Sequence, residues 1–373
     1  MRVALIVPGG LDPSGEARTI PALMWLTERL ARRHELEVFS LRQLDRPRVF
    51  EVRGVPVWDM GLAGHAGSAR AALALRRCLA RLRSRPPFDV FHGCWLGLPG
   101  LLAIIGGGLQ RRPTVLSIMG TELAPARRNP ATRRLAARAV LRRAARVTVG
   151  SRFLAAHAAR LGVRPEIVPL GVEETWFEDA AAPPGPPWRL LHVASLNPWK
   201  DQVTLLKAVA ELVRRDDRVH LDVVGEDTMR GAMAREAAAL GLGRFVTFHG
   251  FVPSGSLGAF YRRAHLLLLP SRYEAQGVVV LEAAAHGVPT VGTAVGLVAD
   301  GDGDWTVAVP VGDPGALARA VVAVLEDPVR REALGARAAR WAREHDADWT
   351  AARFEGIYAR CADQRSRRVA APR

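Results

Sequence analysis

Short apolar runs alternate with helical patterns along the whole chain. Continuous apolar runs of this length are typical of strands in a parallel sheet that is buried on both faces. They lie at 3–8, 35–41, 89–93, 113–120, 146–151, 166–171, 189–195, 220–226, 244–250, 265–271, 289–293 and 306–310. Between them lie amphipathic patterns such as 201–215, whose apolar stripe consists of Leu205, Leu206, Val209, Leu212 and Val213. This alternation predicts an α/β protein with doubly wound parallel sheets.

The chain length and one Pro/Gly-rich stretch predict two domains. A single hydrophobic core stops growing at roughly 250–300 residues, and this chain has 373. The stretch AAAPPGPP at 180–187 separates two series of strands, so we expect it to be a linker. The predicted architecture is a Rossmann-like N-terminal domain at 1–179 and a Rossmann-like C-terminal domain at 188–345, facing each other across a central cleft.

Residues 346–373 carry a further apolar pattern. Trp349, Phe354, Ile357 and Tyr358 recur at roughly helical spacing, so this segment needs a surface on which to dock. It either closes the C-terminal domain or crosses back as a helix to the N-terminal domain.

Composition places the chain among ordinary globular proteins. Hydrophobic residues make up 49% and charged residues 24%, which argues against disorder. There is no apolar stretch of about 18 residues to span a membrane, and MRVALIVPGG is interpreted as a first strand, not a signal peptide. The three cysteines, Cys78, Cys94 and Cys361, form no CxxC motif. We therefore expect neither a disulfide framework nor a cysteine zinc site, and a reducing, cytoplasmic location.

The net charge of +15 is concentrated in the first half of the chain. Residues 70–160 contain 18 arginines but only Asp89 and Glu122 as acidic residues. Such a distribution suits an anionic membrane surface at the inner face, an anionic substrate or a nucleic acid. A nucleic acid is disfavoured because no aromatic residues form a binding motif among the arginines. Arginine bias of the genome is the competing explanation, since only Lys200 and Lys207 of the 52 basic residues are lysines.

Two glutamates stand eight residues apart in PSRYEAQGVVVLEAAAHGVPT (270–290). Glu274 is expected on the loop after a buried strand, and Glu282 about a turn inside the next helix. In open α/β sheets ligands bind at the carboxyl ends of the strands, which makes Glu274 a candidate. On spacing alone, a solvated loop residue and an exposed helix residue explain the pair equally well.

Two other segments offer phosphate-binding chemistry. Lys200 lies on the loop after the strand that ends near Ser195, and a lysine in an arginine-rich chain suggests that compact ammonium geometry is wanted. The first strand runs into PGGLDPSGEA (8–17), whose glycines could cradle a phosphate or a sugar, or could simply form a tight turn. The spacing is not GxGxxG and no acidic residue ends the second strand, so a nicotinamide dehydrogenase is disfavoured.

Other chemistries have little support in the sequence. The segment DGDGD (300–304) resembles a calcium loop, but Trp305 and Val311 replace the required glycine and glutamate, so a solvated turn is expected. There is no HxxxH pair, GxSxG elbow or P-loop. Metal catalysis and serine hydrolysis are therefore not predicted.

Several of these segments together resemble family 4 glycosyltransferases, retaining enzymes of the GT-B fold. EAQGVVVLE followed by AAAHGVPTVGT resembles the family's E-x7-E motif, and ASLNPWKD is similar to its G-R-L-x-x-x-K-G segment. VVGEDT and VTFHGFVP resemble further blocks of the C-terminal domain, and DVFHGCW, VTVGSRF and EIVPLGVEETWF resemble blocks of the N-terminal domain. The resemblance covers about residues 1–345 and is strongest over 189–312.

The resemblance implies transfer of a sugar from a UDP-, GDP- or ADP-sugar to a glycan, lipid-linked or small-molecule acceptor, without a metal or other cofactor. Glu274 would lie near the transferred sugar, Lys200 would neutralise the diphosphate, and Glu282 would hold the ribose hydroxyls. The remaining donor contacts would come from backbone amides at Gly277, Val278 and Val279, from Phe251 and Val252 beside the nucleobase, and from Gly10 of the other domain.

Three departures from the family pattern affect the donor and acceptor positions. Ser195 stands where the family usually has an arginine, so one of two phosphate cations is missing, and Met119 replaces a histidine that usually touches the donor sugar. His92 is the first residue of an altered H-x-H motif, and we assign His92 and Met119 to the acceptor side. Two alternatives remain open, a GT-B-fold sugar-nucleotide epimerase and a silent nucleotide-sugar-binding module.

Overall fold

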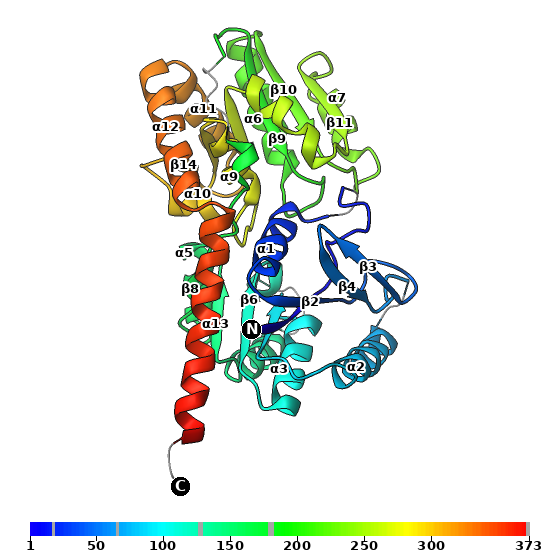
Figure 1. Cartoon of the computed structure of the whole chain (residues 1–373). Coiled ribbons are helices and arrows are strands. Elements are labelled where there is room, and N and C mark those ends of the chain that lie inside the picture. The colour runs from blue at the N-terminus through cyan, green and yellow to red at the C-terminus, as the bar shows by residue number, and fades with distance from the viewer. Residues whose placement is uncertain (17–18, 65–66, 126–129, 178–182, 371–373) are drawn as a thin grey trace. The chain divides into compact units, whose positions relative to one another are not determined.

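The computed structural model describes residues 1–16, 19–64, 67–125, 130–177 and 183–370. The chain divides into two compact units, of which unit 1 is Met1–Leu170 with Ala347–Arg373, and unit 2 is Gly171–Asp346 (Figure 1). Each unit is built on one mainly parallel sheet with helices between its strands. The predicted doubly wound α/β fold class is therefore confirmed.

Unit 1 has an eight-stranded sheet in the order β3-β4-β2-β1-β5-β6-β7-β8, and all neighbouring pairs are parallel except the β3–β4 hairpin. The strands are β1 (Arg2–Val7), β2 (Glu35–Ser40), β3 (Arg48–Val52), β4 (Val55–Asp59), β5 (Val90–Cys94), β6 (Thr114–Ile118), β7 (Arg146–Val149) and β8 (Glu166–Ile167). The helices are α1 (Pro21–Ala31), α2 (Gly67–Arg83), α3 (Leu98–Gln110), the 3₁₀ turn η1 (Thr121–Leu123), α4 (Pro130–Leu141), α5 (Arg152–Ala159) and α13 (Ala347–Ala370). The β3–β4 hairpin lies outside the strands predicted from the sequence. Its turn at Arg53 and Gly54 has positive φ at both residues, 47° and 78°, which matches the twist of a two-residue hairpin.

Unit 2 has a six-stranded, wholly parallel sheet in the order β11-β10-β9-β12-β13-β14. The strands are β9 (Trp188–Val193), β10 (Val219–Val224), β11 (Val246–Gly250), β12 (Leu266–Leu269), β13 (Thr290–Thr293) and β14 (Thr306–Val309). The helices are η2 (Glu174–Trp176), α6 (Gln202–Arg215), α7 (Ala232–Ala239), η3 (Ser254–Ser256), α8 (Gly258–Arg263), α9 (Val278–Ala285), α10 (Gly296–Asp300), α11 (Pro314–Leu325) and α12 (Pro328–Glu344). The predicted stripe of α6 is confirmed, because Leu205, Leu206, Val209 and Leu212 are buried in the core and Val213 packs against it.

The C-terminal helix α13 belongs to unit 1, where it packs against α1 (Figure 1). Phe354, Ile357 and Tyr358 are fully buried, and Arg29 of α1 forms an ion pair with Asp348 at 3.0 Å. The apolar residues of this segment therefore find their docking surface on unit 1.

The division between the units does not fall in the Pro/Gly-rich stretch 180–187. The chain passes from unit 1 to unit 2 between Leu170 and Gly171, because the segment after this point packs on unit 2. Trp176 is buried there, with its ring centroid 6.1 Å from Tyr261 and 5.8 Å from His286. Pro184 is likewise held in unit 2, since its carbonyl is hydrogen-bonded to His265. Residues 178–182 lie outside the described residues.

Candidate active site

Two loops of unit 2 meet where its strand order changes direction. β10 and β11 lie on one side of β9, and β12 and the strands after it lie on the other. The loop after β9 carries Lys200 and the loop after β12 carries Glu274. In doubly wound sheets this switch point opens a crevice at the carboxyl ends of the strands, where ligands bind. The topology therefore places both predicted residues at the expected position in the fold.

Lys200 and Glu274 contact each other directly. The distance from Lys200 Nζ to Glu274 Oε1 is 2.5 Å, and Ser271 Oγ donates a hydrogen bond of 2.7 Å to the same carboxylate oxygen. Glu274 is only 8% exposed, whereas the Lys200 side chain retains 25% of its accessible surface. The interpretation of Glu274 as a solvated loop residue is therefore wrong.

The Lys200 loop is held in place by hydrogen bonds of its own and by the neighbouring loop. Asn197 accepts a hydrogen bond from the Trp199 amide through its side chain and from the Lys200 amide through its carbonyl. From the other loop, the Arg272 amide donates to the Trp199 carbonyl at 2.8 Å, and the Arg272 guanidinium pairs with the buried Asp201 at 2.9 Å. Sequence reasoning missed Arg272, because its pairing with Asp201 appears only when the two loops are brought together.

The Glu274 loop leads into α9 through Gly277, which has a φ of +86°. This left-handed conformation favours glycine, because a Cβ atom strains it. The first amides of a helix have no intrahelical acceptor, and they attract anions. Val278 and Val279 open α9 and are half-buried. The backbone amides predicted to bind a diphosphate thus lie at a helix N-terminus, next in the chain to the loop of Glu274.

Glu282 lies in the middle of α9 and is buried rather than exposed on a helix surface. It is 4% exposed, and the Tyr261 hydroxyl donates a hydrogen bond of 2.7 Å to its Oε2. Tyr261 in turn stacks on His286 at a centroid distance of 5.3 Å. Burial raises the pKa of Glu282 to about 7, and the Tyr261 hydrogen bond partly opposes this rise. Sequence reasoning missed Tyr261, which comes from the separate helix α8.

His192 of β9 lies in the electrostatic field of both Lys200 and Glu274. Its Nδ1 donates to the Leu268 carbonyl at 2.8 Å, which leaves Nε2 to accept from Gln202 at 3.2 Å. Complete burial lowers the pKa of His192 to about 4. The ring is therefore neutral near pH 7 and both of its nitrogens are occupied.

The other predicted donor contacts of unit 2 lie at the same edge of the sheet. Ser195 is exposed at the end of β9, where its Oγ is 3.4 Å from the Asn197 side-chain nitrogen. Phe251 follows β11 and is 57% exposed, and Val252 beside it is half-buried. An exposed aromatic ring at a carboxyl edge is available to a ligand, so these positions remain predictions.

Gly10 and Met119 belong to unit 1. Gly10 has a φ of +93°, and a Cβ atom there would lie 2.6 Å from Ile20 Cδ1, so only glycine fits. Its amide already donates to Gln43 Oε1 at 2.7 Å. Close packing therefore explains this glycine without a ligand. Met119 is half-buried at the carboxyl end of β6.

The prediction that His92 lies on the acceptor side does not fit the structure. Its side chain is completely buried, with Nδ1 2.7 Å from the Tyr358 hydroxyl and Nε2 2.7 Å from Ser117 Oγ. Burial lowers the pKa of His92 to about 3. The reason is its position on β5, an inner strand of the sheet on which all five residues are buried. His92 links β5 to α13.

Among the described residues, no group of three or more His, Cys, Asp or Glu side chains is arranged to hold a metal ion. In the segment 300–304, Asp302 and Asp304 are exposed, and they bond to the Ala308 amide and to Arg337. Residues 302–304 form the solvated turn that the sequence predicts, whereas Asp300 is the last residue of α10 and Gly301 is buried. Within the described part of the chain, no helix is long and apolar enough to cross a membrane.

Two glycosyltransferase families match consecutive parts of the chain. The domain described as Glycosyl transferases group 1 matches residues 173–341, and the Glycosyl transferase 4-like domain matches residues 20–173. The D-inositol 3-phosphate glycosyltransferase of Streptomyces griseus is 34% identical over 194 residues, which cover 48% of this chain and 41% of that protein. The glycogen synthase of Mycobacterium tuberculosis is 34% identical over 176 residues, 47% of this chain and 42% of that protein. The alignments thus span less than half of each relative.

Solved structures share the fold over nearly the whole chain. Sucrose-phosphate synthase from Thermosynechococcus elongatus matches with a TM-score of 0.80 and 21% identity, covering 96% of this chain and 98% of that one. Anabaena HepE in complex with UDP-glucose matches with a TM-score of 0.76 and 16% identity, covering 96% and 99%. A putative UDP-N-acetylglucosamine 2-epimerase from Listeria monocytogenes matches with a TM-score of 0.66 and 13% identity, covering 100% and 98%. At these identities the likeness concerns the fold alone.

Proposed function

Because this chain belongs to the family 4 type of glycosyltransferases, which have the GT-B fold, we propose that it transfers a sugar from a nucleotide-diphosphate sugar to an acceptor, with retention of anomeric configuration. The contact between Lys200 and Glu274 carries this proposal. It places an ammonium and a carboxylate side by side at the switch point of a doubly wound sheet, beside the N-terminus of α9.

Breaking a sugar–diphosphate bond separates positive from negative charge, and the site offers a carboxylate for the first and an ammonium with helix amides for the second. Positive charge builds on the anomeric carbon and negative charge on the departing phosphate. Preorganised charges and dipoles stabilise such a transition state in a site from which water is excluded. Lys200 and the amides of α9 face the phosphate, and Glu274 faces the anomeric carbon. Ser271 holds the carboxylate when the diphosphate competes for Lys200.

Glu282 is proposed to accept hydrogen bonds from the ribose hydroxyls of the nucleotide. Tyr261 occupies its Oε2 at 2.7 Å, which leaves Oε1 for a ligand. A ribose hydroxyl bonds more strongly to a carboxylate than to a carboxylic acid. Because the pKa of Glu282 is about 7, we expect nucleotide affinity to rise with pH across neutrality.

The donor is proposed to be a UDP-, GDP- or ADP-sugar, with a UDP-sugar to be tested first because HepE was solved with UDP-glucose. The acceptor is proposed to be a glycan, a lipid-linked sugar or a small polyol. Lys200 and the helix amides supply the phosphate-binding charge in this proposal, so no metal or other cofactor is required.

Transfer is favoured over epimerisation by the state of His192. An epimerase needs a residue to remove and return a proton, and this histidine has both nitrogens hydrogen-bonded within the core. Purified protein should be incubated with a panel of UDP-, GDP- and ADP-sugars. Release of nucleotide marks a transferase, interconversion of sugars without release an epimerase, and a raised melting temperature alone a binding module.

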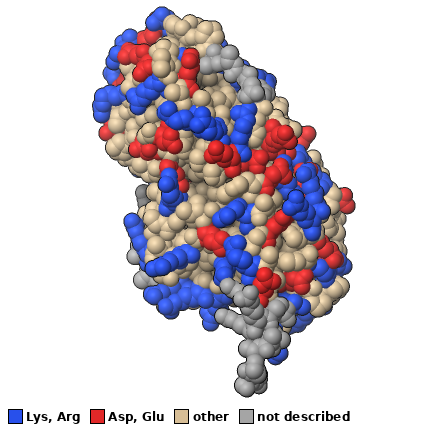
Figure 2. All heavy atoms as spheres, turned by 60° about the vertical axis from the view of Figure 1, so that its left-hand side comes forward, with Lys and Arg blue, Asp and Glu red and all other residues tan. Residues whose placement is uncertain are grey.

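We further propose a peripheral contact between unit 1 and an anionic membrane through α4. Leu135 on this helix is 70% exposed, and Arg138 of α4 and Arg142 and Arg143, which directly follow α4, are also exposed. Elsewhere the basic excess is partly neutralised by acidic residues from outside 70–160, as in the ion pairs Arg85–Glu37 and Arg146–Glu166. Figure 2 shows acidic side chains among the basic ones over most of one face. The proposal therefore rests on α4 and not on the total charge.

A further inference from the structure

Unit 1 contains a pocket that plays no part in the proposed transfer reaction. It is a hollow of about 600 Å³ between helix α2 and the β3–β4 hairpin, a volume within the range of small-molecule sites. Four arginines line it, Arg48 from β3 and Arg76, Arg77 and Arg81 from α2, together with Trp58 of β4. We call it the α2 pocket.

The positive charge of the α2 pocket is not balanced by its own lining. Its one acidic lining residue, Asp59, is 2% exposed and accepts hydrogen bonds from Ser40 Oγ and from the amides of Gln43, Leu44 and Gly61. Among the described residues, none of the four arginines forms an ion pair with a carboxylate. Arg77 donates to the Met60 carbonyl at 2.6 Å, a neutral acceptor.

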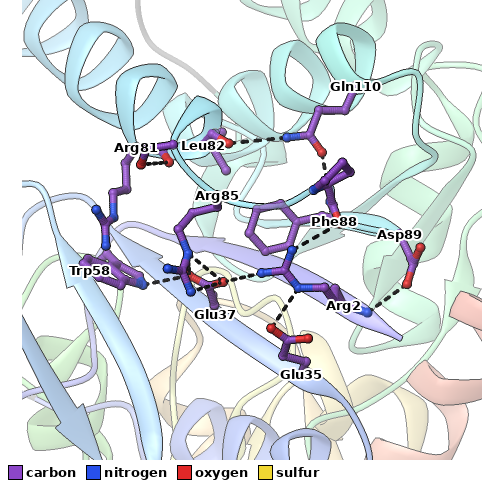
Figure 3. A network of polar contacts seen from close by, with 12 residues as sticks. Arg2, Glu35, Glu37, Trp58, Arg81, Leu82, Arg85, Phe88, Asp89 and Gln110 are labelled. Atoms are coloured by element: carbon purple, nitrogen blue, oxygen red, sulfur yellow. Dashed lines mark hydrogen bonds and ion pairs between the residues drawn. The ribbon is translucent and has the colours of Figure 1, made fainter.

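Two neighbouring arginines of this unit have their positive charge neutralised by a carboxylate (Figure 3). Arg2 and Arg85 both reach the buried Glu37, at 3.0 and 2.9 Å. Trp58 Nε1 also donates to Glu37, at 3.0 Å. That carboxylate therefore already serves three donors, two of them cationic, and Arg81 forms no ion pair with it.

Arg81 lies across the indole of Trp58 instead, as Figure 3 shows, with its guanidinium carbon 3.3 Å from the ring centroid. Its Nε is buried and has no hydrogen-bond partner. Burial and the nearby Arg85 lower the pKa of Arg81. A buried polar atom without a partner is uncommon and costly in native structures. Arg81 lies in the electrostatic field of Glu37 but, unlike Arg2 and Arg85, does not contact its carboxylate.

We propose that the α2 pocket binds the phosphate group of a small molecule that also carries an apolar portion. Arg77 and Arg81 stand one helical turn apart on α2, and Arg48 stands on the opposite wall. Guanidinium groups bind phosphate oxygens through paired N–H donors, and several of them match a dianion better than a single carboxylate. Trp58, Met60 and Val49, which is 54% exposed, provide the apolar part of the lining.

The test is calorimetric titration of the intact chain carrying Lys200→Ala, so that phosphate bound at the proposed donor site is not counted. The probes are inorganic phosphate and hexyl phosphate, and hexyl phosphate should bind more tightly because it fills the apolar part of the pocket. Arg76→Gln and Arg81→Gln should each weaken hexyl phosphate binding by about tenfold, the usual effect of losing a charged hydrogen bond. Arg83→Gln is the matched control, since Arg83 is an exposed residue of α2 outside the pocket lining, and it should change binding less than about twofold.

A second arm distinguishes a soluble ligand from a lipid headgroup. Vesicles of phosphatidylcholine, with and without phosphatidylglycerol, are sedimented with the same variants. Suppose that the chain binds phosphatidylglycerol vesicles, and that Arg76→Gln weakens this binding while Arg83→Gln does not. This result would assign the phosphate to a lipid, whether or not hexyl phosphate also binds. The proposal would be overturned if Arg76→Gln and Arg83→Gln weakened binding equally, or if neither hexyl phosphate nor the vesicles bound. Arg76 is exposed, so its variant keeps the test valid if Arg81→Gln disturbs the Trp58 stack. Failure here leaves the transferase proposal intact, because that proposal depends on residues of unit 2.

Discussion

Lys200 Nζ lies 2.5 Å from Glu274 Oε1, although 74 residues separate them in the chain. In the absence of a donor, each charge of the pair is neutralised by the other. If a diphosphate binds Lys200 as proposed, it would release Glu274 from this partner. The carboxylate would then be free to stabilise a positive charge, and the proposal therefore couples donor binding to the activation of Glu274 through one contact.

Glu274→Gln should lower the rate of transfer at least about 100-fold, the usual cost of removing one transition-state electrostatic partner. The amide has the shape of the carboxylate and still accepts from Ser271, so circular dichroism and the melting temperature should stay close to wild type. Glu332→Gln, an exposed change on α12, is the control. Turnover near the wild-type rate in Glu274→Gln would contradict the assignment.

Lys200→Ala should raise the donor dissociation constant by about tenfold to 100-fold, because Ser195 supplies no second cation. Lys200→Arg should restore only part of the affinity, since a planar guanidinium does not reproduce the compact geometry of an ammonium at the phosphate. Arg272→Gln should have a smaller effect, because the Arg272 side chain is 53% exposed and paired with Asp201. Titration with UDP-sugars measures all three. Complete rescue by arginine would show that charge alone matters at position 200.

Tyr261→Phe removes the hydrogen bond to Glu282 while keeping the ring that stacks on His286. That hydrogen bond lowers the pKa of Glu282, so its loss should raise this pKa further above about 7. If the ribose binds the ionised carboxylate, the pH below which UDP binding weakens should shift upward. UDP dissociation constants measured between pH 6 and 9 test this, and an unshifted midpoint would remove Tyr261 from the nucleotide site.

Glu282→Gln should change how the stability of unit 2 depends on pH. Burial raises the pKa of Glu282 from 4.5 to about 7 in the folded protein, so the folded state binds this proton more tightly than the unfolded chain. Its favourable contribution is therefore complete below about pH 4.5 and is lost as the pH rises through about 7. The free energy of unfolding of wild type relative to Glu282→Gln should fall by roughly 3 kcal/mol across this interval.

Urea unfolding at pH 5 and pH 8 measures this difference. The buried His92 and His192, with pKa values lowered to about 3 and about 4, destabilise the fold as the pH falls below 6.5. They do so equally in both proteins and therefore cancel. A difference that does not vary with pH would mean that Glu282 has an ordinary pKa.

The membrane proposal predicts that the chain co-sediments with vesicles containing phosphatidylglycerol but not with pure phosphatidylcholine. Replacing Arg138, Arg142 and Arg143 by glutamine should weaken this binding by roughly 100-fold at low salt, since each cation near an anionic surface contributes about 1 kcal/mol. The control replaces three exposed arginines of unit 2, Arg319, Arg330 and Arg340. If vesicle binding does not depend on lipid charge, or if the control variant weakens it equally, the membrane proposal fails and the acceptor is expected to be soluble.

Much of the fold follows from periodicity, because buried parallel strands and amphipathic helices leave different patterns. The positions of Lys200 and Glu274 also follow, since both are fixed by their place after a strand. Arg272 and Tyr261 do not, because each enters the site through packing between segments that are distant in sequence. The sequence shows a residue's place along a strand, but not which neighbour covers its side chain.

The same limit explains the errors in unit 1 and at the boundary between the units. His92 follows Val90 and Phe91 on a short strand, and only its place in the middle of the sheet order shows that it is covered. The stretch 180–187 has the composition of a linker, yet the burial of Trp176 draws the preceding segment into unit 2. Amino-acid composition does not show at which residue the chain begins to pack on unit 2.

Because α13 belongs to unit 1, the order of synthesis differs from the order of assembly. The ribosome makes residues 1–170 before it makes Phe354, Ile357 and Tyr358, whose side chains are completely buried in unit 1. Until these residues emerge, His92 lacks its hydrogen-bond partner Tyr358, and the surface of α1 that receives α13 remains uncovered. Unit 2, whose residues 171–346 are continuous, can close while unit 1 is still incomplete. During translation the half-built unit 1 is therefore the part of the nascent chain that needs protection from aggregation.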